Sequence, residues 1–144
     1  MKHVISLIFL LITSLNSWGG EVRITAVSIK QQSPEHYQFN VTLKHQDTGW
    51  EHYADAWRIV DEQGNILATR TLFHPHVNEQ PFTRSLNRVK LDEHLNTLYI
   101  EAHDTVHGWS KNRLRIRLSD LQNGQLTIQL THRYFIKSFL LVLL

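Results

Sequence analysis

The chain has 144 residues, and its 15 Lys and Arg residues nearly balance 13 Asp and Glu residues, giving a formal net charge of +2. This balance, with no basic stripe between aromatic residues, argues against nucleic-acid binding. The absence of cysteine excludes both a disulfide framework and lipid attachment at a cysteine. Histidine, in contrast, occurs ten times and is the most informative feature of the composition.

Residues 1–20 have the pattern of a secretory signal peptide. A basic start at Lys2 precedes an apolar run over residues 4–12, and Ser17 and Gly19 are small residues spaced for cleavage after Gly19. The alternative is an uncleaved anchor helix, but the apolar run is short for a bilayer span of about 20 residues. We therefore expect an exported protein, either periplasmic or secreted.

Residues 21–131 alternate apolar and polar side chains with the period of two that is typical of strands. The alternation slips by one residue between Ala26 and Val27, which predicts a bulge or a strand that changes sheets. A kink is expected near Asn87. The predicted strands cover residues 21–29, 36–45, 53–61, 66–73, 82–91, 97–104, 113–121 and 126–130.

About seven regularly spaced strands favour an all-β fold, an antiparallel β-sandwich, with a small barrel as the alternative. Residues 91–118 resemble the last two strands of fibronectin type III and immunoglobulin-like domains, with Leu91, Thr97, Tyr99 and Gly108 at the corresponding places. The resemblance implies that fold. Tyr99 departs from the family pattern, because strict alternation places it away from the core.

Three further segments, "GWEHYADAW", "HPHVNEQPFTRSL" and "AHDTVHGW", resemble a group of small exported bacterial proteins with no assigned function. They fall within residues 49–109. This resemblance implies a secreted β-sandwich and carries no activity with it.

In a sandwich, chain direction should bring three loops to one end of the domain, here called the loop pole. The loops cover residues 46–52, 73–81 and 103–112, and loops at the ends of sandwiches are usual places for binding. The other histidines, at 36, 45, 94 and 132, are expected elsewhere. The predicted binding surface at the loop pole consists of Trp50, His52, His74, His76, Glu79, His103, His107 and Trp109.

Three charged residues near this pole share the inward parity of apolar neighbours: Asp55, Arg84 and Asp104. A buried charge needs a partner. We therefore expect these residues to form an ion-pair cluster that supports the loops. The alternative is that each is separately solvated at a strand end.

Two functions fit the loop pole. The first is non-catalytic recognition of a protein, peptide or glycan, because exposed aromatic residues enrich recognition surfaces. The second is binding of zinc or copper, with His74, His76, His103 and His107 as candidate ligands, since neutral imidazole suits these metals.

An enzyme is not expected. Asp104, His107 and Ser110 are of the types found in catalytic triads, but they lie in one loop without a nucleophile elbow. The apolar C-terminal tail, residues 132–144, is too short to span a bilayer. It could add an edge strand, dock on the sandwich or provide the only expected contact with a membrane.

Overall fold

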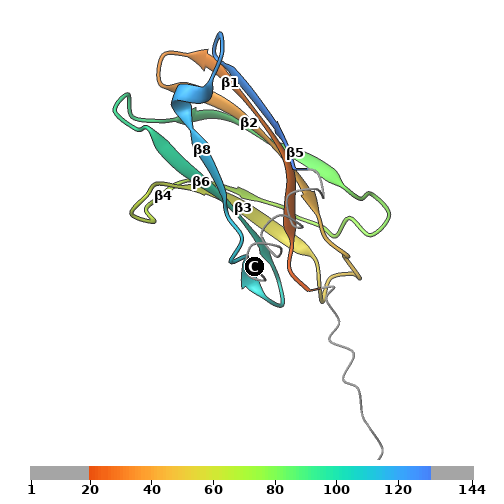
Figure 1. The fold of residues 1–144 in the computed structure, drawn as a ribbon. Helices are drawn as coiled ribbons and strands as arrows, with labels where there is room; N and C mark the ends of the chain where they lie inside the picture. Colours follow the sequence, from red (N-terminus) through yellow and green to blue (C-terminus); the bar gives the residue numbers. More distant parts are fainter. Residues whose placement is uncertain (1–19, 131–144) are drawn as a thin grey trace, which may run out of the picture.

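Two antiparallel sheets stack face to face in the computed structural model, which describes residues 20–130 (Figure 1). This arrangement confirms the predicted all-β sandwich. Within that range no helix is long and apolar enough to cross a membrane. The predicted signal peptide, apart from Gly20, and the apolar tail lie outside the described residues.

The first sheet has four strands in the order β5-β2-β1-β9. The second has five strands, with the order β4-β3-β6-β7 and with β8 also paired to β6. The elements are β1 (Arg23–Ser33), β2 (His36–Lys44), β3 (Ala54–Val60), β4 (Ile66–Thr71), β5 (Phe82–Lys90), β6 (Thr97–Asp104), β7 (Gly108–Trp109), β8 (Leu114–Arg117), the 3-10 turn η1 (Leu118–Asp120) and β9 (Gln125–Gln129).

The core lies between the sheets and is built from the inward side of each alternating strand. Phe39 and Val41 of β2 face Trp57 and Ile59 of β3 and Ile100 of β6 across it, and all five side chains are completely buried. Burial of each such side chain is favourable by roughly 1.5–3 kcal/mol. Apolar burial therefore holds the two sheets together in a chain without disulfides.

The strand boundaries differ from expectation at two places. β1 continues to Ser33, because it forms a tight hairpin with β2 in which Ser33 pairs with His36. The stretch expected to be a loop before residue 113 contains the short strand β7, which pairs back onto β6. The β6–β7 hairpin places residues 104–107 at its tip, and two of them belong to the site described below.

Irregularities in the strands change the direction of several side chains. The register of β1 shifts between Ile24 and Ala26, so the predicted irregularity is present but lies before Ala26 and not after it. Arg88 has a φ of 56°, next to the kink expected near Asn87. Another register shift, between Ala54 and Ala56 where β3 pairs with β6, was not predicted. It turns Asp55 away from the core side that simple alternation assigns to it.

The three predicted loops do meet at one end of the sandwich. Hydrogen bonds join them, since the N–H of His76 donates to Asp47 Oδ2 at 2.7 Å and the N–H of Tyr53 donates to Thr105 Oγ1 at 3.2 Å. The expected loop pole is thereby confirmed. It brings together residues that are separated by more than 50 positions in the sequence.

Candidate metal centre

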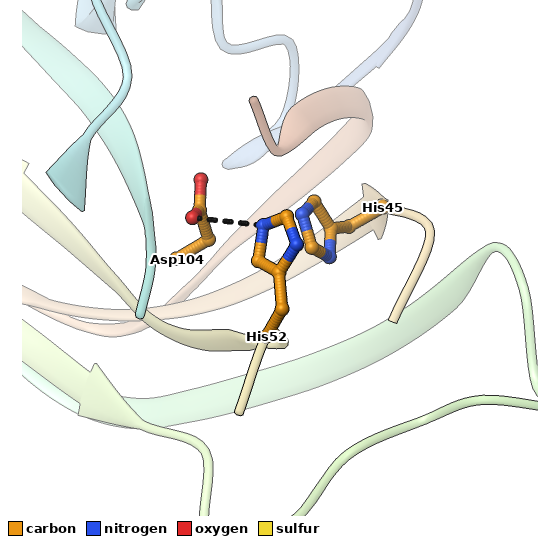
Figure 2. A group of neighbouring side chains, drawn as sticks. All are labelled: His45, His52 and Asp104. Atoms are coloured by element: carbon orange, nitrogen blue, oxygen red, sulfur yellow. Dashed lines mark ion pairs between the residues drawn. The ribbon is translucent and has the colours of Figure 1, made fainter. Parts of the chain in front are cut away.

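Two histidines and one aspartate converge at the loop pole. The ligand atoms of His45, His52 and Asp104 all lie within 4.8 Å of one another. His45 follows the end of β2, His52 lies in the next loop, and Asp104 is the last residue of β6. Figure 2 shows the His52 ring between the other two side chains. Both sheets therefore contribute to one cluster.

Asp104 is the buried carboxylate of this cluster, with no exposed surface. Its Oδ1 accepts hydrogen bonds from the N–H groups of Val106 (3.0 Å) and His107 (2.8 Å) and from His107 Nδ1 (3.0 Å). Burial acts to raise the pKa of Asp104, but these hydrogen bonds outweigh it and hold the pKa below its ordinary value. Asp104 is thus a preformed anion, and its Oδ2 is buried without a hydrogen-bond partner.

His52 faces this carboxylate. Its Nε2 lies 3.3 Å from Asp104 Oδ1, although the contact lacks the geometry of a hydrogen bond, and the nitrogen is buried without another partner. A buried polar atom that makes no hydrogen bond is costly, and such atoms are rare in folded proteins. A cation bound between the His52 imidazole and the Asp104 carboxylate would give both groups a partner.

His45 is fixed by a second buried carboxylate. Its Nδ1 donates to Asp47 Oδ1 at 2.5 Å, and its Nε2 points to the carbonyl oxygen of Gly20 at 3.0 Å. Asp47 also accepts from the N–H of Ala54 at 3.1 Å. Carboxylates that hold one ring nitrogen of a histidine are typical of metal sites, where the other nitrogen binds the ion. A groove of about 380 Å³ is lined in part by His45 and Asp47.

Two of these residues, His45 and Asp47, were not predicted from the sequence as part of the site. His45 was expected outside the loop pole, and Asp47 was not considered. Both lie at the pole, because β2 ends at Lys44 and the loop begins directly after it. The useful signal was the spacing His45-x-Asp47 at the pole end of a strand. A histidine and a carboxylate that close together can form a hydrogen bond that fixes the ring.

The four predicted metal ligands do not form one site. Among them only His107 touches the cluster, through its bond to Asp104. His74 and His76 lie together in another loop, with ring centroids 4.5 Å apart, and His103 lies on the outer face of the second sheet. The expected metal set is therefore corrected: the loops meet as predicted, but their paths direct these rings to different places.

His76 is buried against the core and not turned to solvent. Its ring stacks on Phe82 with centroids 3.8 Å apart, while neighbouring His74 is exposed. Burial lowers the pKa of His76, and the positive charge of Arg84 lowers it further. His76 is therefore a neutral packing residue under the loop pole.

The remaining predicted surface residues are placed as follows. His103 donates from Nδ1 to Asp55 Oδ1 at 2.5 Å and contacts the edge of Trp109, whose ring is covered by the Arg58 guanidinium at 3.8 Å. These side chains form a polar patch on the outside of the second sheet. At the loop tips, Trp50 is 69% exposed, and the side chain of Glu79 is 59% exposed.

The expected ion-pair cluster of Asp55, Arg84 and Asp104 is not formed. Asp55 pairs with His103, because the register shift at the start of β3 turns it outward. Arg84 pairs with Glu79 at 3.1 Å, and Asp104 is satisfied largely by backbone N–H groups. Asp104 is the member of the three that is buried as its parity predicts.

Comparison with known proteins finds a distant relative. A protein named "Putative lipoprotein" from Halomicrobium mukohataei is 33% identical over 89 residues, which make up 62% of this chain and 43% of the relative. The chain thus spans less than half the length of that relative. No protein-family model matches the chain, and no solved structure matches it.

Proposed function

We propose that this protein is an exported, non-catalytic binding protein that holds a divalent transition-metal ion, zinc or copper, at its loop pole. His45, His52 and Asp104 are the ligands. The observation that carries the proposal is the pair of buried, unpartnered atoms, His52 Nε2 and Asp104 Oδ2, in a cluster that also includes His45. Two imidazoles and a carboxylate form a donor set that suits these metals.

The distances support this assignment. Two ligands bound to zinc at about 2.0–2.1 Å and a tetrahedral angle lie roughly 3.3 Å apart. His52 Nε2 and Asp104 Oδ1 are separated by 3.3 Å. The His45 ring is oriented by Asp47, and its ligand atom lies within 4.8 Å of those of His52 and Asp104.

Export is supported by two features. The first is the signal-peptide pattern of residues 1–20. The second is the name of the Halomicrobium mukohataei relative, since a lipoprotein is attached to a membrane after export. Both support export, and the absence of cysteine from the chain favours a periplasmic or secreted form over a lipid-anchored one.

Metal titration of the purified mature protein tests the proposed function. We expect submicromolar affinity for Zn²⁺ or Cu²⁺, measured by competition with a chromophoric chelator, and about 100-fold weaker binding in His52→Ala, because loss of one of three ligands removes roughly 2.7 kcal/mol. His94→Ala is the matched control, because the His94 side chain is 87% exposed and remote from the cluster. Unchanged affinity in His52→Ala, or no submicromolar binding by the wild type, would reject the site.

A second function, recognition of a protein, peptide or glycan, is favoured by a separate observation. Four large apolar side chains are exposed on the pole loops, and exposed apolar groups mark interaction sites. This function is tested by comparing the binding of the wild type and of a Trp50→Ala/Phe73→Ala variant to arrays of proteins, peptides and glycans. Ile66→Ala is the control, because Ile66 is also exposed but lies at the start of β4, at the end of the sandwich away from the pole. The four residues are Trp50, Phe73, Val77 and Val106.

A further inference from the structure

We propose that removal of the signal peptide completes the metal centre, with the free α-amino group of Gly20 as an additional ligand. This inference rests on the proposed metal binding by His45 and His52. It assigns a chemical role to the new N-terminus and makes Cu²⁺ the favoured ion.

Gly20 lies beside His45 and His107 at the loop pole. Its carbonyl oxygen accepts a hydrogen bond from His45 Nε2 at 3.0 Å. The ring of His107 is also so close that a Cβ on Gly20 would lie 2.7 Å from His107 Nε2. A side chain at this position would require the His107 ring to move. The backbone nitrogen of Gly20 is one bond from its Cα, so it lies near the His107 ring and near the carbonyl group that His45 contacts.

The predicted cleavage position converts this nitrogen into a ligand. When Gly19 is attached, the nitrogen belongs to a peptide bond, and resonance withdraws its lone pair. Cleavage after Gly19 leaves a primary amine, whose lone pair can bind a metal once its proton is displaced. The amine and the carbonyl oxygen of one residue are separated by two backbone carbons, so both can close a five-membered ring with one ion.

The distance between His45 Nε2 and the Gly20 carbonyl oxygen fits binding of both atoms to one ion. Two ligands at about 2 Å from one ion and at a right angle lie roughly 2.8 Å apart. His45 Nε2 and the Gly20 carbonyl oxygen are 3.0 Å apart, so an ion can replace the proton between them with little movement of the backbone. His107 supports this arrangement, because Asp104 holds its Nδ1 and its Nε2 faces Gly20.

The completed donor set has three nitrogens and at least one oxygen. Tetragonal nitrogen and oxygen coordination favours Cu²⁺, which also binds such ligands more tightly than the other divalent first-row ions. The precursor, with its peptide nitrogen, lacks one of these donors. We infer that the protein gains high metal affinity only after it has been exported and processed.

The test compares forms of the protein that differ only at the N-terminus. N-terminal sequencing of the exported protein is expected to give Gly20 as the first residue. The matched forms begin at Gly20 with a free amine, at Gly20 with an acetylated amine, and at Trp18 so that Gly20 stays within the chain. We expect Cu²⁺ affinity to be at least tenfold lower in the last two forms. Electron paramagnetic resonance is expected to show one fewer bound nitrogen.

The outcomes separate this inference from the proposed function. Equal affinity and equal nitrogen coupling in the free and acetylated forms, with binding still lost in His52→Ala, would overturn the role of Gly20 and leave the metal site. A natural first residue other than Gly20 would also overturn it. Failure of every form to bind Cu²⁺ or Zn²⁺ would reject the metal site itself. Equal melting temperatures of the metal-free forms would confirm that acetylation has not disturbed the fold.

Discussion

Three aspartate–histidine pairs share one geometry at or near the loop pole. In each pair the carboxylate contacts the Nδ1 of the ring and leaves Nε2 directed elsewhere. Such contacts fix the tautomer and the orientation of the imidazole. Whether such a ring can bind a metal depends on what its Nε2 faces. Only two of the three pairs lie next to the buried cluster. The pairs are Asp47–His45, Asp104–His107 and Asp55–His103.

Asp47→Asn tests the orienting role of its carboxylate. We expect metal affinity to fall about 10–100-fold, because the ring of His45 loses a charged acceptor that fixes it. Stability should also fall by about 1–3 kcal/mol, because an amide cannot accept on both sides and a buried donor is left without a partner. The affinity is measured by chelator competition and the stability by urea unfolding.

Asp55→Asn is the matched control for this substitution. Asp55 makes the same 2.5 Å contact with a histidine, but on the outer face of the second sheet. Metal affinity should therefore remain unchanged in Asp55→Asn. An equal loss of affinity in both variants would show that Asp47 has no specific role at the site.

Individual site residues were predictable only where a regular strand carries them. Asp104 ends β6, and strict alternation correctly predicts its burial. Asp55 defeats the same rule, because the register shift at the start of β3 reverses its side. Asp47 lies in a loop, where no period exists, and one of its three hydrogen-bond donors, the N–H of His76, comes from another loop 29 residues away.

At the scale of elements, the β6–β7 hairpin positions much of the site. Its tip is a tight turn in which Asp104 Oδ1 accepts from the N–H groups of two following residues. Gly108 closes the turn with a φ of 79°, a left-handed conformation that other residues adopt only with strain. The carboxylate thus organises the turn and also faces the proposed ion.

Gly108→Ala is expected to reduce both stability and metal affinity. The left-handed backbone costs about 1–2 kcal/mol for a residue with a Cβ. If the hairpin tip shifts to relieve this strain, metal affinity should fall up to about tenfold, the equivalent of roughly 1.4 kcal/mol. Thermal unfolding and metal titration measure the two effects.

Gly64→Ala provides the comparison for this variant. Gly64 has a φ of 86°, a Cβ there would meet no atom within 4 Å, and its turn joins β3 to β4 at the end away from the loop pole. It should lose similar stability and retain full metal affinity. Loss of affinity in both variants would indicate a general effect of strain on the fold.

The elements themselves were largely predictable from the sequence. Alternation located the main strands because a sandwich buries one side of each strand, and chain direction located the loop pole. The grouping of side chains within the pole was not predictable in this way. It depends on loop paths and on the short strand β7, whose two residues are too few to show a period.

At the scale of the molecule, the proposed centre joins the two sheets. His45 directly follows β2 of the first sheet, and Asp104 belongs to β6 of the second. The core between the sheets is apolar, and the chain has no disulfide that could reinforce this end. An ion bound to both residues would therefore act as a cross-link at the pole.

Metal binding should accordingly stabilise the whole domain against heat. At a free metal concentration 100 times the Kd, a ligand that binds only the folded state adds about 2.7 kcal/mol. For a domain of this size, that corresponds to a rise in melting temperature of roughly 10 °C, reduced where the unfolded histidines also bind metal. Calorimetry with and without Zn²⁺ or Cu²⁺ measures the shift. His52→Ala should lose most of it, whereas His94→Ala should keep it. An equal shift in both variants would mean that the ion binds outside the cluster and does not connect the sheets.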